Sequence, residues 1–378
     1  MGRGISILKK VFVIFVCAAT LASTNVKAFA EDSLDEQIEN AKEDVQIRQD
    51  EYDAALEKYD RGSLGFVEWM LSKDDLTEKQ IYDLNRAKSE LESACEEDFS
   101  RFVSANKTGI PEFRNDKVVC LGDDNDATSL KNTKKMFPML NEVNARRDDD
   151  ANFVGAIKRN PAKTSFYFMA IAQTGANRGA VLKDHSYVKT TCENLAFTSR
   201  RGAVNMWYSE IGSFNEAKKK LGYTTLTSEE QVREVESEAG ASRVGHYTNL
   251  FLAKDQLMGI GYTAYGYVGT QGTESYEATG YNEDSSKFAA YTIDEFQALF
   301  DEYCKSLRCD ELKAALEKSK EYLKSLEKQK CDACSHVFGE GEHIPLTCTN
   351  DGGIRYVCSK CNYTKYEELT PATGHNMV

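Results

Sequence analysis

Residues 245–262 read GHYTNLFLAKDQLMGIGY, and this stretch decides the fold that the sequence predicts. It places His246 ahead of an apolar run that contains Gly259 and Gly261. His246 and His185 are the only histidines between residues 31 and 330. Both are therefore candidate site residues.

Four further stretches precede this one in a fixed order. They are MLNEVNARR at 139–147, DHS at 184–186, CENLAF at 192–197 and AVNMWYSEI at 203–211. Together the five resemble the motifs of the CAP superfamily, which contains cysteine-rich secretory proteins, antigen 5 and plant pathogenesis-related 1 proteins. Several motifs in the right order carry much less risk of a chance match than any single one.

The resemblance implies an α+β fold, a three-layer α-β-α sandwich, over residues 131–275. It makes 203–211 a helix that bears a glutamate, and it makes 245–251 and 258–262 strands. It also implies that His185, Glu193, Glu210 and His246 converge in an open cleft. The sequence departs from the family pattern at Asn249 and Leu252, where the family usually has Gln and Trp, and this leaves the ligand of the cleft open.

The chemistry of these four residues fits such a grouping. Imidazole and carboxylate together suit a divalent cation such as zinc, with His185 and His246 as the metal ligands. The glutamates would then be ligands themselves, or acceptors that fix the tautomer of each ring. Without a metal, the same groups would act as acid and base.

Three functions follow from this reading. The first is a secreted or cell-surface protein whose cleft binds a divalent metal and a small apolar ligand or an extracellular, cell-wall component. The second is a metal-dependent or acid-base hydrolase, similar to a peptidase, with the same tetrad as catalytic residues. The third is a structural or adhesion protein of the cell surface. No local signature of a nucleophile and its base accompanies the tetrad, so the sequence favours binding.

Residues 331–378 form a separate cysteine-rich module that resembles a zinc ribbon. Two C-x-x-C pairs suit a tetrahedral structural zinc: Cys331 with Cys334, and Cys358 with Cys361. A rival ligand set, carried by a resemblance to repeats near the ends of bacterial surface proteins, combines Cys348, Cys358 and Cys361 with His343 or His375. A third interpretation is disulfides, because the chain is expected to be exported.

The remaining segments give the domain organisation. Residues 1–30 are expected to be a signal peptide, with a basic start, a short apolar run and Ala28-Phe29-Ala30 as the cleavage site. Residues 31–106 are predicted to form a helical hairpin or a coiled coil that could bind a coiled-coil partner, 107–130 a linker, and 290–330 a helix.

The composition excludes some classes of partner. The net charge of -13 argues against nucleic acid, because phosphate binding needs clustered Lys and Arg. No stretch after the predicted signal peptide is apolar and long enough for a transmembrane helix.

Overall fold

The structure is a computed structural model that describes residues 33–98, 117–182, 184–185, 192–198, 202–265, 274–281 and 285–372. The predicted signal peptide and His375 lie outside the described residues. The chain divides into two compact units, which we call the tail unit and the central unit. The tail unit comprises the described residues up to Ile47 together with those from Leu316 onward, and the central unit runs from Arg48 to Ala315.

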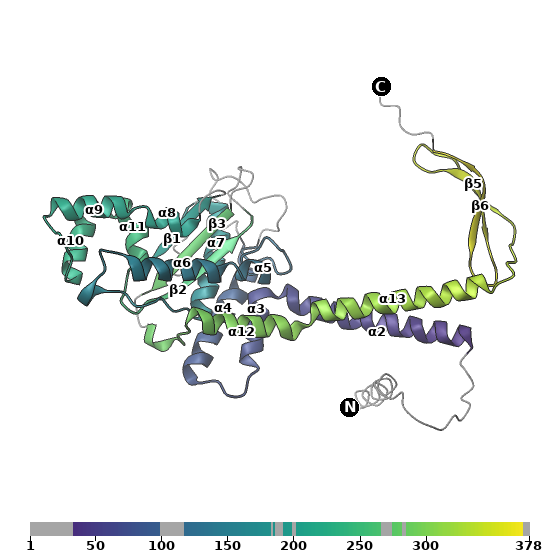
Figure 1. The fold of residues 1–378 in the computed structure, drawn as a ribbon, viewed down its shortest axis with the longest axis horizontal. Coiled ribbons are helices and arrows are strands. Elements are labelled where there is room, and N and C mark those ends of the chain that lie inside the picture. Colours follow the sequence, from purple (N-terminus) through teal and green to yellow (C-terminus); the bar gives the residue numbers. More distant parts are fainter. Residues whose placement is uncertain are drawn as a thin grey trace. The chain divides into compact units, whose positions relative to one another are not determined.

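Two long helices build the helical part of the tail unit, namely the beginning of α2 (Leu34–Asp60) and the end of α13 (Cys309–Asp332). Ile38 and Ala41 of α2 pack with Leu326 of α13, and all three are buried. Lys330 pairs with Asp35 at 2.5 Å, and Ser319 donates to Asp44 at 2.5 Å, so the two helices run antiparallel (Figure 1). The apolar seam of the first helix therefore has its partner in the same chain.

A small antiparallel sheet follows α13. Its strands, β4 (Glu342–Ile344), β5 (Gly352–Val357) and β6 (Thr364–Thr370), lie in the order β4-β5-β6. Between Ala333 and Ala372 the buried residues are Gly352 and Cys358 alone. A sheet of this size without a hydrophobic core is marginal in water, so something other than apolar burial must stabilise it.

The central unit is built around a second antiparallel sheet with the strand order β1-β3-β2. The strands are β1 (Glu193–Thr198), β2 (Leu257–Thr263) and β3 (Glu274–Tyr281). Helix α7 (Phe166–Leu182) packs along β2 and β3 (Figure 1). Gly259 and Gly261 allow this close approach, because a Cβ built on Gly259 would lie 1.8 Å from the carbonyl oxygen of Phe168.

The other helices of the central unit surround this core. They are α3 (Gly62–Leu71), α4 (Glu78–Glu96), α5 (Leu130–Thr133), α6 (Met136–Asp149), α8 (Ala203–Tyr208), α9 (Ile211–Lys220), α10 (Glu229–Ala239), α11 (Ala241–Leu250) and α12 (Ile293–Leu307), with short 3-10 turns at Gly155–Ile157 and Ser285–Lys287. Phe66, Phe166 and Phe296 pack ring against ring between α3, α7 and α12. The described residues thus combine helices with two small sheets, which is compatible with the predicted α+β class, and helices predominate.

Three local predictions differ from the structure. The stretch 245–251 lies mainly in helix α11 rather than in a strand, and only 257–263 forms the strand β2. The helix over 290–330 is two helices, because Arg308 adopts a left-handed conformation with φ 55° between α12 and α13. The hairpin within 31–106 is also different: the seam residues Leu34, Ile38 and Ala41 pack on α13, and α4 packs on α3 and α7.

The predicted linker 107–130 is packed where the structure describes it, from Lys117 onward. Val118 and Val119 are buried, and Asp126 is fully buried. The carboxylate of Asp126 accepts hydrogen bonds from the backbone of Cys120 and Thr128 and from the side chain of Asn177. The polar residues that suggested a linker therefore satisfy one another inside the fold. None of the helices among the described residues is long and apolar enough to span a membrane.

Candidate functional site

The structure brings together the four residues His185, Glu193, Glu210 and His246, which we call the His/Glu cluster. His185 follows the end of α7, and Glu193 is the first residue of β1. Glu210 lies between α8 and α9, and His246 lies on α11. Four separate segments of the chain thus each contribute one side chain to the cluster.

Glu210 contacts His246 through both carboxylate oxygens. Oε1 lies 2.7 Å from Nδ1 of the His246 ring, and Oε2 accepts the backbone N–H of His246 at 2.9 Å. The same Oε2 accepts the backbone N–H of Tyr247 at 3.2 Å. One carboxylate therefore fixes both the ring of His246 and the helical turn that carries it.

His185 has a single, longer contact with Glu193. Its Nδ1 lies 3.4 Å from Oε2 of Glu193, and the Glu193 side chain is fully buried. The rings of His185 and His246 are 6.1 Å apart between centroids, with their planes inclined by 27°. Both imidazoles keep part of their surface exposed, so solvent and solutes reach them.

Residues next to the cluster hold its segments in place. Asn194 of β1 donates to the backbone carbonyl of His246 at 2.8 Å and accepts from Asn249 at 2.9 Å. The hydroxyl of Tyr247 donates to the carboxylate of Asp150 at 3.0 Å, and burial followed by that carboxylate raises the pKa of Tyr247 far above its usual range. Strand β1 and helix α11 are thereby tied to each other and to the end of α6.

The geometry sets the chemistry that the two histidines offer. A carboxylate is an acceptor, so a carboxylate beside Nδ1 favours the tautomer with the proton on Nδ1. Nε2 of His246, whose Nδ1 lies 2.7 Å from Glu210, then keeps its lone pair for a ligand. Two rings bound through nitrogen to one tetrahedral ion, with bonds of about 2.1 Å, have centroids about 5–6 Å apart. The observed 6.1 Å lies just outside that range, and the two planes are inclined by 27°.

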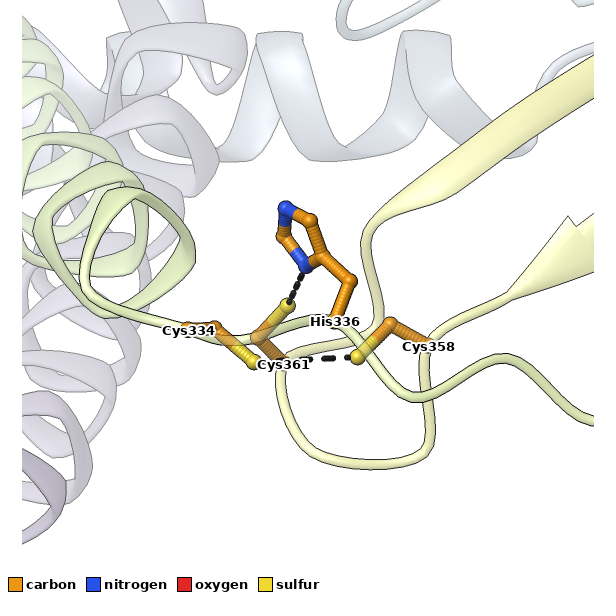
Figure 2. Close-up of side chains that lie close together, drawn as sticks. All are labelled: Cys334, His336, Cys358 and Cys361. Carbon is orange, nitrogen blue, oxygen red and sulfur yellow. Dashed lines mark hydrogen bonds between the residues drawn. The ribbon is translucent and has the colours of Figure 1, made fainter.

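A second cluster lies in the tail unit. The ligand atoms of Cys334, His336, Cys358 and Cys361 all lie within 4.8 Å of one another. In the part of the chain that the structure describes, this is the group of three or more His, Cys, Asp or Glu side chains that could hold a metal ion. Figure 2 shows the four side chains turned towards one another, with Cys334 and His336 on one segment and the two other cysteines on a second. We call this group the tail cluster.

The tail cluster contains three of the four thiols that the cysteine spacing predicts as zinc ligands, and it contains a histidine in place of the fourth. Cys334, Cys358 and Cys361 are in it, whereas Cys331 is outside it and His336 takes the fourth position. Of the rival ligands, His343 lies on β4 and Cys348 is exposed, and neither belongs to the tail cluster. The signal that identifies His336 is its C-x-H spacing from Cys334, in the segment directly after α13.

Electrostatics distinguishes the thiols. Burial opposes ionisation of Cys358, but the backbone N–H groups of Lys360, Cys361 and Val337 and the His336 ring together lower its pKa below the usual range. Burial, followed by the neighbouring Cys361, raises the pKa of both Cys331 and Cys334 instead. The thiolate, the form that binds metals, is therefore favoured at Cys358 among these three thiols.

Comparison with protein-family models, with curated proteins and with solved structures finds no match.

Proposed function

We propose that residues 131–275 form a CAP-superfamily domain, a three-layer sandwich, in a secreted or cell-surface protein that binds a divalent metal at the His/Glu cluster. The observation that supports this most is the double contact of Glu210 with His246 together with the facing ring of His185. The order of the motifs along the chain supports membership of the superfamily, and the predicted signal peptide supports export.

In this proposal His185 and His246 hold the ion through Nε2. Glu193 and Glu210 act from behind the rings by orienting them and increasing their basicity. In this division of roles the two histidines leave coordination positions for water or an exogenous ligand. A bound divalent cation would act there as a Lewis acid that attracts an oxygen or carboxylate group of that ligand.

Calorimetric titration of the full chain with zinc tests this function. The variants His185→Ala and His246→Ala should each weaken one binding event at least 10-fold, and His343→Ala, which removes an exposed histidine of the tail unit, should not. Equal titration curves for the wild type and both cluster variants would overturn the proposal.

A turnover assay with a peptide library tests the same residues for catalysis. We expect no turnover. Cleavage that requires His246 would replace the binding function with the hydrolase. Zinc binding at the full wild-type stoichiometry after the loss of both histidines would leave the domain as a structural element.

A further inference from the structure

We propose that Cys334, His336, Cys358 and Cys361 form a structural zinc site that holds the β4–β6 sheet to the end of α13. This site is independent of the His/Glu cluster, and it differs from the ligand sets that the spacing of the cysteines predicts. His336 is a ligand, whereas Cys331, His343 and Cys348 are not.

The distances between ligand atoms agree with a tetrahedral ion. With Zn–S bonds of about 2.3 Å, two sulfurs on one zinc lie about 3.8 Å apart. The Sγ atoms of Cys334 and Cys358 are 3.7 Å apart. A sulfur and a nitrogen on the same zinc are about 3.5 Å apart, and Sγ of Cys361 is 3.3 Å from Nδ1 of His336. Both separations match one ion, whereas a disulfide would need its sulfurs about 2.05 Å apart.

The backbone shapes the Cys358–Cys361 turn for metal binding. The N–H of Cys358 donates to the carbonyl of Tyr363 at 2.8 Å, and the N–H of Asn362 donates to the carbonyl of Cys358 at 2.9 Å. Asn362 has a φ of 60°, the left-handed conformation that asparagine tolerates better than most residues. The N–H of Val337 donates to Sγ of Cys358 at 3.4 Å and adds positive potential beside that sulfur.

The His336 ring is fixed by packing. It stacks on Tyr363 with a centroid distance of 4.7 Å and an interplanar angle of 21°, and it lies 5.7 Å from the Phe338 ring. Tyr363 comes directly after the Cys358–Cys361 turn, so the stacking holds His336 Nδ1 towards the two sulfurs of that turn. Such support is what a metal-ligating histidine needs to keep one orientation.

The lack of a core in the sheet supplies the physical reason for a metal. Apart from Gly352 and Cys358, every residue between Ala333 and Ala372 keeps at least part of its surface exposed. Small domains of this kind are stable only with a staple such as a structural zinc. The four ligands join the segment after α13 to the turn between β5 and β6, the two places where a staple would close this part of the tail unit.

Cobalt substitution of the full chain tests the site. Sulfur-to-cobalt charge-transfer absorption arises only from thiolate ligands, so an ion at the His/Glu cluster does not contribute to it. The wild type should bind one cobalt ion with this absorption. Cys334→Ser, Cys358→Ser and Cys361→Ser should lose this absorption. In His336→Ala the affinity of the site for zinc, measured by displacement of cobalt, should fall at least 10-fold. Cys331→Ser, Cys348→Ser and His343→Ala are matched controls from the same module that should keep wild-type affinity.

The variant His336→Cys separates loss of a ligand from loss of folding. We expect it to bind cobalt with the stronger charge-transfer absorption of four thiolates. Loss of the metal in Cys331→Ser together with wild-type affinity in His336→Ala would overturn the ligand set. A disulfide between Cys334 and Cys358, found by mass spectrometry in a chain that binds no cobalt after reduction, would overturn the site itself.

Discussion

The Glu210 carboxylate binds His246 twice, through the ring nitrogen Nδ1 at 2.7 Å and through the backbone N–H at 2.9 Å. Glu210 lies 36 positions before His246 in the chain, between two helices that contribute no other residue to the His/Glu cluster. A change confined to this carboxylate therefore tests whether ring orientation controls the proposed metal site.

Glu210→Gln should weaken zinc binding at the His/Glu cluster about 10–100-fold, which is the usual effect of losing the carboxylate behind a metal-ligating histidine. The amide keeps the shape of the side chain but offers one acceptor oxygen instead of two. Calorimetric titration measures the change. Glu216→Gln on α9, where the side chain is largely exposed, is the control and should bind like the wild type. Equal affinities for wild type and Glu210→Gln would mean that this carboxylate has no role in the site.

Gly259→Ala should destabilise the central unit by about 1–3 kcal/mol or more, because the new methyl group would meet the backbone of α7 and only a shift of the backbone could relieve the clash. Urea unfolding followed by tryptophan fluorescence measures this, since both tryptophans, Trp69 and Trp207, lie in the central unit. In the control Gly212→Ala on α9, nothing lies within 4 Å of the new Cβ, so the exposed helix should gain up to about 1 kcal/mol. An unchanged midpoint for Gly259→Ala would contradict the packing of α7 on β2.

Arg147→Met should cost about 3 kcal/mol or more. The guanidinium is fully buried and donates to the carbonyls of Leu250 at 2.7 Å and Ala253 at 2.8 Å, and to the side chain of Gln256 at 2.7 Å. Burial, followed by the charge of Arg159, lowers its pKa to about 10, so it stays charged at neutral pH. Methionine would leave these acceptors buried without a donor. The same fluorescence measurement on Arg146→Met, which removes a half-exposed neighbour, should show a change within about 1 kcal/mol.

Asp83 should make the stability of the central unit depend on pH. Its carboxylate accepts the N–H groups of Phe166 and Tyr167 at the start of α7, but burial dominates and raises its pKa to about 7. Between about pH 4 and pH 7 the folded chain then keeps a proton that the unfolded chain has lost. Its contribution to stability therefore falls as the pH rises, by up to about 1.4 kcal/mol per pH unit. Asp83→Asn should remove this dependence on pH from urea midpoints measured between about pH 4 and pH 7. The same dependence in wild type and variant would contradict the role of Asp83.

The members of the His/Glu cluster were predicted from the resemblance of the ordered motifs to the CAP superfamily, which selected Glu193 and Glu210 from many acidic residues. The histidines were the easier part, because only two occur between residues 31 and 330. The strand β2 was predictable too, since its glycines and apolar residues form one continuous buried run. The stretch before it was wrongly predicted as a strand, and it lies in α11 instead, where Glu210 accepts backbone N–H groups.

Long-range pairing was not predictable in the same way. The seam of α2 is a regular apolar repeat, but its partner Leu326 lies almost 300 residues further along the chain, and the repeat does not encode which helix covers it. The replacement of Cys331 by His336 has a similar cause. Cys331 is in the last turn of α13 and lies near Cys361 without joining the tail cluster, whereas Cys334 and His336 lie after the helix and belong to it.

Counting the metal ions bound at saturation tests the central claim most directly. The full chain, the variant His185→Ala/His246→Ala and the variant Cys358→Ser/Cys361→Ser would each be dialysed against buffered zinc and analysed for zinc per chain. The account predicts two ions for the wild type and one for each double variant, because the two clusters are in different units. Equal zinc content in the wild type and in His185→Ala/His246→Ala would contradict a metal site at the His/Glu cluster.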